Sequence, residues 1–408
     1  MGIYRCPYCF AEHKLANIEF RCVNYSGDCK EEPDEKFARY KFGQNVNKSQ
    51  VPLKAHVFPP KISKLELFTR NLYMPVDENC NQCKTLSNIR LCPSCHNTLP
   101  PNVENMNDNI LISVVGSYAS GKSHYISTLI NELQKHVMPD MFGTSFVEVN
   151  KEVRETYAEK YYNPLYEEGT VLEPTKPNER QEPLIYEATI KKGSKEKQIQ
   201  FMFYDVAAEN LGDINTMVTM ARHIGYSDGI ILLVDPLQIG EIRNQLPEKV
   251  LDQNIGLPTE SIKYQTPDVM IKYITKVVQQ YKKIYGNKKI DGVPVAVTLS
   301  KLDTIFDFLP LGSVVKEMSG SLKKGAYDRE EIKEISTELK DFINTYDKQK
   351  ISKVIESNFA QVAYFGVSAL GDSPIMDEDR QKKMIHRPKP HRVEEPFLWI
   401  LDQLGVIS

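Results

Sequence analysis

Cysteine is absent from most of this chain, and that absence limits what the protein can be. The 408 residues contain eight cysteines, all between Cys6 and Cys95. A long cysteine-free body is atypical of a secreted disulfide scaffold, and clustered CxxC pairs favour metal binding. The chain also lacks any apolar run near the roughly 20 residues that cross a bilayer. We therefore expect neither a secreted nor a membrane-spanning protein.

An excess of charge of one sign is also missing. The formal net charge is -3, so no chain-wide attraction to nucleic acid or to a membrane surface is expected. Only residues 1–100 are basic, with 14 Lys and Arg against 10 Asp and Glu. The first residues lack the basic-then-apolar order of a signal peptide. These observations predict a cytoplasmic protein of about two or three domains.

Apolar runs that alternate with helical patterns predict an α/β fold. Short β-branched runs are typical of buried parallel strands, and they lie at 110–115, 199–206, 229–236, 294–301 and 362–369. Apolar residues at helical spacing lie at 123–137, 269–285, 330–346 and 394–406. This alternation predicts right-handed crossovers and a doubly wound, mostly parallel sheet. The polar stretch 138–195 is expected to hold one helix near 150–162.

The strongest motif is a phosphate loop. The segment 116–123 reads GSYASGKS and matches G-x-x-x-x-G-K-[ST] between a predicted strand and a predicted helix. Its glycines let backbone N–H groups curl around phosphate oxygens, and the helix N-terminus adds its positive end. We expect Lys122 to reach the β- and γ-phosphates and Ser123 to ligate Mg²⁺. The predicted loop residues are Gly116, Ser117, Tyr118, Ala119, Ser120, Gly121, Lys122 and Ser123.

A further Mg²⁺ ligand is expected at the end of the strand 199–206. Asp205 begins DVAAE, which resembles the D-x-x-G signature of GTPases. In that signature the Asp holds Mg²⁺ through water and a backbone N–H senses the γ-phosphate. Ala208 stands where those proteins have glycine. Asp235 is the rival ligand, with a strand-end turn former as its other interpretation, and we favour Asp205.

A threonine between the phosphate loop and Asp205 is expected to complete the Mg²⁺ site. The segment 169–183 offers Thr170 and Thr175. Prolines on both sides of Thr175 stiffen the loop there, so we favour Thr175. The alternative is that both are plain loop threonines.

Hydrolysis needs a group that orients the attacking water. Glu209 lies four residues after Asp205 and is a candidate, although it could equally be a solvated loop carboxylate. The predicted catalytic residues are therefore Lys122, Thr175 and Glu209. Arg222 or a partner's residue could serve as an arginine finger.

Two motifs favour GTP over ATP. SKLD at 300–303 resembles the N-K-x-D guanine motif, whose carboxylate accepts from guanine N1 and N2, a donor pair that adenine lacks. SAL at 368–370 resembles the element whose backbone meets guanine O6. Both follow predicted strands, where open α/β sheets bind ligands. The predicted base-binding residues are Ser300, Lys301, Asp303, Ser368, Ala369 and Leu370.

Together these motifs resemble the TRAFAC clade of P-loop GTPases over roughly residues 108–405. More narrowly, the cysteine-rich head and RVEEPFLWIL at 392–401 resemble bacterial double-GTPase-type families with N-terminal zinc ribbons, from conflict or defence operons. The resemblance implies the P-loop GTPase fold and a nucleotide-state switch that works with operon-encoded protein partners. It suggests a domain at 110–408 with insertions near 138–195 and 304–360, joined by a linker at 101–109 to a zinc-binding domain at 1–100.

The cysteines predict two structural zinc sites. The CxxC pairs Cys80/Cys83 and Cys92/Cys95 are eight residues apart and form a compact zinc-ribbon pattern. Four sulfur ligands leave no open position on the ion, so the sites should be structural rather than catalytic. The other four cysteines could form a second site, but an interleaved pairing of Cys6 and Cys9 with either later knuckle stays open. His96 is an alternative ligand, and a redox role for CPYC lacks its βαβ setting. The predicted ligands are Cys6, Cys9, Cys22, Cys29, Cys80, Cys83, Cys92 and Cys95.

The sequence thus predicts a GTP-hydrolysing switch that binds Mg²⁺ and two zinc ions and whose head docks a protein partner. Two alternatives remain open. One is an adaptor that binds nucleotide without hydrolysis. The other is a nucleotide-gated nucleic-acid binder, which the basic head permits but does not indicate.

Overall fold

The structure is a computed structural model of the whole chain. It describes residues 3–23, 29–43, 45–61, 73–104, 109–175, 182–192, 195–207, 221–248, 250–251, 267–284, 289–348, 350–376 and 382–407. These residues form two compact units. The smaller contains the N-terminal residues up to Asn109 together with Glu182 and Pro183, and the larger contains the remainder.

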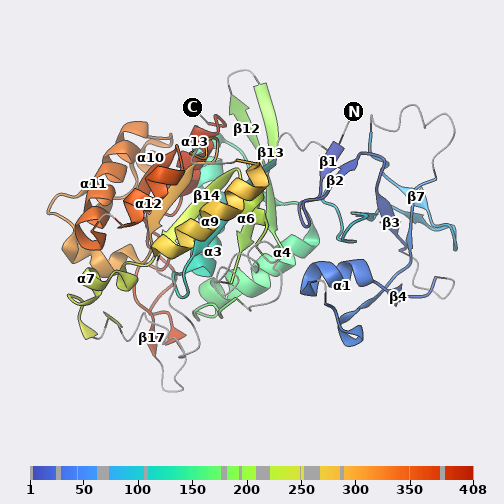
Figure 1. Cartoon of the computed structure of the whole chain (residues 1–408), viewed down its shortest axis with the longest axis horizontal. Helices are drawn as coiled ribbons and strands as arrows, with labels where there is room; N and C mark the ends of the chain where they lie inside the picture. The colour runs from blue at the N-terminus through green and yellow to red at the C-terminus, as the bar shows by residue number, and fades with distance from the viewer. Residues whose placement is uncertain are drawn as a thin grey trace. The chain divides into compact units, whose positions relative to one another are not determined.

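A seven-stranded sheet forms the centre of the larger unit (Figure 1). Its strand order is β11-β12-β13-β10-β14-β15-β16. The strands are β10 (Asn109–Gly116), β11 (Val147–Glu148), β12 (Leu184–Lys192), β13 (Lys195–Asp205), β14 (Gly229–Val234), β15 (Val295–Leu299) and β16 (Val362–Gly366). The pairs from β10 through β16 are parallel, whereas β11, β12 and β13 pair antiparallel. The predicted α/β fold with a mostly parallel sheet is confirmed.

The central strands are short apolar runs because both of their faces are covered. Every residue of β14 and β15 is buried, and so is every residue of β10 after Asn109. Successive side chains of a strand point to opposite faces, so continuous burial requires packing on each side. One such contact is tight, since a Cβ on Gly229 would lie 2.4 Å from Ile400 Cγ2.

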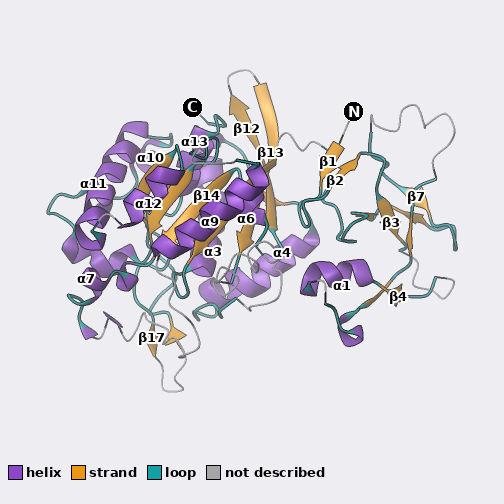
Figure 2. Cartoon of the chain, viewed as in Figure 1, coloured by secondary structure: helices purple, strands orange, loops and turns teal. Residues whose placement is uncertain are grey.

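Helices connect and cover these strands (Figure 2). In Figure 1 the long helix α9 crosses in front of β14. The helices of the larger unit are α3 (Lys122–Glu132), α4 (Lys151–Tyr157), α6 (His223–Tyr226), α7 (Gly240–Arg243), α9 (Pro267–Lys282), α10 (Gly320–Lys324), α11 (Arg329–Asp347), α12 (Lys350–Asn358) and α13 (Glu395–Gln403). Short 3-10 turns lie at Pro236–Gln238, Leu302–Phe308 and Val314–Lys316. In the described part of the chain, no helix combines the length and apolarity that a bilayer span needs.

The stretch 138–195 holds more structure than the single helix expected there. α4 continues as a π-helical segment (Ala158–Glu167), and α3 likewise continues as one (Leu133–Met141). Each contains a proline, which lacks the N–H that a regular α-helix would use. β12 was missed, although its buried Tyr186, Ala188 and Ile190 alternate with less buried residues, as in a strand that is covered on one face.

The smaller unit is built from very short strands. They are β1 (Ile3–Arg5), β2 (Glu12–Lys14), β3 (Glu19–Arg21), β4 (Glu32–Pro33), β5 (Leu53–Lys54), β6 (Val57–Phe58), β7 (Glu78–Asn79), β8 (Leu86–Ser87) and β9 (Arg90–Leu91). Its helix α1 (Glu35–Phe42) begins at Asp34, whose carboxylate accepts from the Phe37 N–H. A short 3-10 turn lies at Lys48–Gln50. Its apolar core is small and includes Tyr4, Phe20 and Phe58.

Candidate functional site

A cavity of about 380 Å³ lies where β10, β13, β15 and β16 end. The predicted phosphate loop, the predicted switch threonine and both predicted base motifs line it. The lining residues in these segments are Tyr118–Tyr125, Val171–Thr175, Ser300, Lys301, Asp303 and Val367–Leu370. Of the predicted residues that the structure describes, Gly116, Ser117 and Asp205 adjoin the cavity without lining it. Four separate sequence segments thus meet at one place.

The phosphate loop wraps tightly at the end of β10. A Cβ on Gly116 would lie 2.5 Å from Ser120 Oγ and 2.9 Å from the Leu233 carbonyl oxygen, so only glycine leaves room there. Gly121 has a φ of +84°, in the left-handed region that favours glycine. Lys122 Nζ donates to the carbonyl oxygens of Gly116 and Ser117, each at 3.0 Å. The lysine therefore lies across the loop that the motif predicts will hold phosphate.

Gln238 supports this loop and was not predicted. Its Oε1 accepts from Ser117 Oγ at 2.6 Å, and its Nε2 donates to the Tyr118 carbonyl at 2.8 Å. Gln238 ends the 3-10 turn that follows β14, so the next strand braces the loop. No motif marks this position, and no sequence signal could have found it.

Three predicted Mg²⁺ ligands meet beside the loop. Asp205 Oδ2 accepts from Ser123 Oγ at 2.6 Å and from Thr175 Oγ1 at 3.1 Å, and the two hydroxyl oxygens lie 3.2 Å apart. Thr170 lies elsewhere, with its hydroxyl donating to the Pro164 carbonyl at 3.3 Å. The structure therefore brings Thr175, the favoured threonine, to Asp205.

The Asp205 carboxylate also receives an unpredicted donor. Tyr161 OH, from the π-helical segment, donates to Asp205 Oδ2 at 3.3 Å. Burial, and then the adjacent carboxylate, raise the pKa of Tyr161, so its hydroxyl keeps its proton. Within the described ranges, the buried Asp205 Oδ1 has no hydrogen-bond partner. Hydroxyl and carboxylate oxygens are what Mg²⁺ prefers, and a buried, unpaired carboxylate oxygen suits a cation.

Asp235, the rival ligand, is engaged differently. Its Oδ2 accepts from Lys301 Nζ at 2.7 Å, and its Oδ1 accepts from the Leu237 N–H at 2.9 Å. It therefore caps the turn after β14, which was its alternative interpretation. Ala208 and Glu209 lie outside the described residues. Arg222 precedes α6 and does not line the cavity.

The two predicted base motifs are bonded to each other. The Ser368 hydroxyl donates to Asp303 Oδ1 and accepts from the Gly371 N–H at 3.0 Å. The Leu302 N–H donates to the Val367 carbonyl at 3.0 Å. Burial raises the pKa of Asp303 by more than the Ser368 hydrogen bond lowers it. The carboxylate is therefore held in a partly desolvated position on the cavity wall.

The segment 391–395, which includes the start of RVEEPFLWIL, is bonded to the SAL motif and to the segment 314–317. His391 and Ser368 exchange two backbone hydrogen bonds, at 2.8 and 3.1 Å. The buried Arg392 guanidinium donates to the Val314 and Glu317 carbonyls and pairs with Glu331 at 2.9 Å. This segment contributed to the family resemblance, and the structure shows its packing role.

The eight cysteines of the smaller unit form two four-thiol groups. One contains Cys6, Cys9, Cys92 and Cys95, and the other contains Cys22, Cys29, Cys80 and Cys83. The favoured pairing of the two later knuckles in one site is therefore wrong. The interleaved alternative, which joined the first knuckle to 92/95, is found. Close Sγ–Sγ distances are 3.5 to 3.7 Å, near the roughly 3.8 Å that tetrahedral zinc with Zn–S of about 2.3 Å requires.

Each CxxC pair lies in the same backbone turn. The N–H of the first cysteine donates to a carbonyl five residues on, and its own carbonyl accepts from the N–H four residues on. That fourth residue has a positive φ in all three turns, at Phe10, Lys84 and His96. Because all three CxxC turns have the same backbone geometry, their local structure does not decide which other pair of cysteines completes each four-thiol group.

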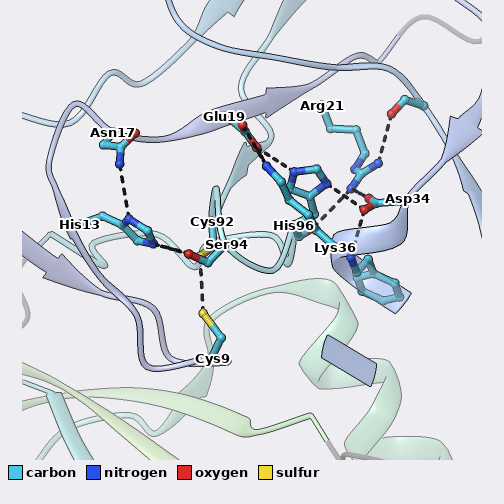
Figure 3. A network of polar contacts seen from close by, with 12 residues as sticks. Cys9, His13, Asn17, Glu19, Arg21, Asp34, Lys36, Cys92, Ser94 and His96 are labelled. Atoms are coloured by element: carbon cyan, nitrogen blue, oxygen red, sulfur yellow. Dashed lines mark hydrogen bonds and ion pairs between the residues drawn. The ribbon is translucent and has the colours of Figure 1, made fainter. Parts of the chain in front are cut away.

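His96 is not a ligand in this arrangement. Figure 3 shows its ring between two carboxylates, with Nδ1 2.8 Å from Asp34 Oδ1 and Nε2 2.8 Å from Glu19 Oε2. Arg21 pairs with the same Asp34 at 2.8 Å. Burial lowers the pKa of His96, but the two carboxylates outweigh it and the net pKa is raised. The alternative in which His96 replaces a cysteine is therefore wrong.

The loop that carries the phosphate-loop motif thus lies between β10 and α3, at the carboxyl edge of a mostly parallel sheet. No family model matches the chain. A protein of Mycolicibacterium smegmatis named "Putative ESX-1 scaffolding and assembly protein SaeC" is 24% identical over 338 residues, which are 78% of this chain and 81% of that protein.

Solved structures show weaker likeness. A chain of the signal recognition particle receptor SRb-GTP/SRX complex from Chaetomium thermophilum has a TM-score of 0.27 and 11% identity, covering 67% of this chain and 96% of that one. The Methanosarcina barkeri Roco2 RocCORdC structure bound to GDP has a TM-score of 0.26 and 12% identity, covering 74% of this chain and 50% of that one. At TM-scores this low, neither likeness assigns a function.

Proposed function

We propose that this protein is a GTP-binding and GTP-hydrolysing switch, a GTPase. One observation carries the proposal: a single cavity is lined both by residues Tyr118–Ser123 of the phosphate loop and by Asp303 of a guanine-type motif. Phosphate and base recognition are thus offered at once. The family resemblance of the motifs supports the same conclusion.

The phosphate loop and the base motifs would bind different parts of the nucleotide. Backbone N–H groups of the loop and the start of α3 attract phosphate, and Lys122 adds a charge that the loop carbonyls already orient. Asp303 accepts from guanine N1 and N2, while the Ser368 hydroxyl holds the carboxylate in place. Adenine would leave that carboxylate unpaired, which costs about 1–3 kcal/mol.

The hydroxyl–carboxylate group suits a magnesium ion. Ser123, Thr175 and Asp205 would hold Mg²⁺, which when bound neutralises charge on the β- and γ-phosphates. Thr175 joins the loop 171–175 to the sheet through Asp205, so this loop can report the state of the site. Glu209 is proposed to orient the attacking water.

The cysteine unit is proposed to hold two structural zinc ions and to dock a protein partner. Eight thiols in two tetrahedral-sized groups support the first part. The scaffolding role printed for the M. smegmatis relative supports a protein rather than a nucleic-acid partner. An operon-encoded partner, a cytoplasmic location and a role in bacterial conflict or defence complete the proposal.

Two measurements test it. Calorimetric titration of the full chain with GTP and with ATP, each with Mg²⁺, should show GTP bound at least tenfold more tightly. Phosphate release should then accompany incubation with GTP. Equal affinity for both nucleotides would contradict the guanine assignment. Tight GTP binding without phosphate release, with and without partner, would favour the non-hydrolysing adaptor.

A further inference from the structure

Tyr161 contacts the candidate magnesium site from outside the cavity. Its hydroxyl donates to Asp205 Oδ2 at 3.3 Å, although Tyr161 is not among the described residues that line the cavity. Both side chains are buried, so this hydrogen bond is shielded from solvent. Any effect of Tyr161 on a bound ion must therefore pass through the Asp205 carboxylate.

Among the described residues, the hydroxyl donors to the Asp205 side chain all use one oxygen. Ser123 Oγ, Thr175 Oγ1 and Tyr161 OH each donate to Oδ2, whereas the buried Oδ1 has no hydrogen-bond partner within those residues. Ser123 and Thr175 are proposed magnesium ligands, so their oxygens would also be needed by the ion. Tyr161 has no such second role, and its bond to Oδ2 leaves Oδ1 for the cation.

Packing fixes both the side chain and the backbone of Tyr161. Its ring stacks on that of Tyr157, with centroids 6.2 Å apart and planes inclined by 16°. The Tyr161 carbonyl accepts from Ser127 Oγ at 3.1 Å, and Tyr157 OH donates to the Ser127 carbonyl at 2.9 Å. Ser127 lies in α3, the helix that begins at the phosphate loop. Tyr161 is thus fastened to that helix as well as to Asp205.

The segment that carries Tyr161 leads directly into the loop that carries Thr175. Near the end of the π-helical segment, the Pro164 carbonyl accepts from the Thr170 N–H at 2.8 Å, which ties the start of that loop to the helix. π-helical turns are rare and are frequent at functional sites. One stretch of chain therefore brings two hydroxyl groups to the same carboxylate oxygen.

We propose that Tyr161 is a positioning residue for magnesium, which holds the Asp205 carboxylate in the orientation that leaves Oδ1 available to the ion or to its bound water. This proposal rests on the proposed function, because the ion is expected together with a guanine nucleotide. Hydrogen-bond partners of metal-ligating carboxylates raise metal affinity by orienting the ligand. Loss of the Tyr161 hydroxyl should therefore weaken magnesium binding and leave the contacts to phosphate and base unchanged.

The test measures how much Mg²⁺ the bound nucleotide needs. The full chain is titrated with a fluorescent, non-hydrolysable GTP analogue while free Mg²⁺ is varied, and the affinity is measured again with EDTA in place of Mg²⁺. Tyr161→Phe keeps the ring and removes only the hydroxyl. In this variant, half of the gain in affinity from Mg²⁺ should need about tenfold more Mg²⁺ than in wild type. The affinity in EDTA should equal that of wild type.

Tyr162→Phe is the matched control. It removes a hydroxyl from the next residue, whose ring stacks on that of Tyr166 with centroids 4.9 Å apart, and it should not change the Mg²⁺ requirement. Thermal unfolding without nucleotide shows whether the variants are folded, and both midpoints should lie within a few degrees of wild type.

An unchanged or lower Mg²⁺ requirement in Tyr161→Phe would overturn the proposal. An equal loss of affinity with Mg²⁺ and with EDTA would also overturn it, because that result indicates a purely structural role. If wild type binds the nucleotide equally well with Mg²⁺ and with EDTA, the guanine site stands and the magnesium positioning is refuted. If wild type binds no guanine nucleotide, the proposed function fails and this inference fails with it.

Discussion

The two units of this chain hold their polar sites in opposite ways. In the smaller unit no strand is longer than three residues among those described, and the four-thiol groups join its turns. In the larger unit β13 alone has 11 residues, and a continuous apolar sheet supports the site at its edge. The larger unit has no cysteine at all.

This difference implies that the four-thiol groups are needed for the smaller unit to fold, whereas the larger unit folds without a ligand in its cavity. The smaller unit buries too little apolar surface to be stable by itself, so its stability should depend on metal ions bound by the two four-thiol groups. The larger unit has an apolar core that does not include Ser123, Thr175 and Asp205, so these three residues can serve binding rather than stability. Loss of the ligand should therefore unfold one unit and leave the other intact.

Removal of zinc is the strongest test of that contrast. Structural zinc contributes about 10–16 kcal/mol in small domains, so a chelator should unfold the smaller unit. Elemental analysis should first find two zinc ions per chain. Limited proteolysis should then cut within residues 1–104 after chelation, while the larger unit resists and still binds GTP. Less than one zinc per chain, or cleavage throughout, would contradict the contrast.

Lys122→Ala should remove binding but not fold. The ammonium donates to loop carbonyls rather than packing in an apolar core, and it is expected to bind phosphate, so GTP affinity should fall at least about a hundredfold. The thermal midpoint without nucleotide should stay within a few degrees of wild type. Lys160→Ala, an exposed lysine of the same unit, is the matched control. Wild-type GTP affinity in Lys122→Ala would refute the phosphate-loop assignment.

Asp303→Asn should change base choice without losing the nucleotide. An amide can donate to the position-2 carbonyl of xanthine, so preference should move from GTP to XTP by about tenfold to a hundredfold. Asp307→Asn alters an exposed carboxylate in the same 3-10 turn and should leave the preference unchanged. Competition of GTP, ATP and XTP measures the shift. If Asp303→Asn behaves like the control, the carboxylate does not read the base.

Gln238→Ala should weaken nucleotide binding about tenfold. It removes two hydrogen bonds to the phosphate loop, each contributing about 1 kcal/mol, and leaves the Ser117 hydroxyl unpaired. Gln245→Ala, which removes a bond from an exposed glutamine farther along the same segment, should have no effect. Titration calorimetry compares the two. Equal affinities would show that the loop holds its shape without this brace.

The smallest expected effect is a pH dependence of stability from His124. Its folded-state pKa of about 4 lies below its ordinary value of 6.5, so protonation favours the unfolded chain. The stabilisation is complete above pH 6.5 and is lost as pH falls toward 4. Between about pH 7.5 and about pH 5.5, wild type should lose about 1 kcal/mol more than His124→Gln. Urea unfolding of both at each pH measures this difference, and parallel curves would contradict it.

The features visible in the sequence are those that depend on neighbouring residues. The phosphate loop needs glycines, a lysine and a hydroxyl on one contiguous turn, so its motif sufficed to locate it at Gly116–Ser123. Fully buried parallel strands need unbroken apolar runs, and β10, β14, β15 and β16 were all predicted for that reason. β12, which is second from the sheet edge, was overlooked because buried and less buried residues alternate from Tyr186 to Ile190 instead of forming an unbroken apolar run.

Features that join distant residues were decided only by the tertiary structure. A CxxC knuckle has the same local geometry whichever thiols share its ion, so the sequence left open the pairing of Cys6 with Cys95, 89 positions away. Tyr161 and Gln238 carry no motif because each bonds to a segment that is distant from it in the sequence. Local sequence patterns determine backbone turns and burial, whereas the packing of segments that are distant in the sequence determines which side chains meet.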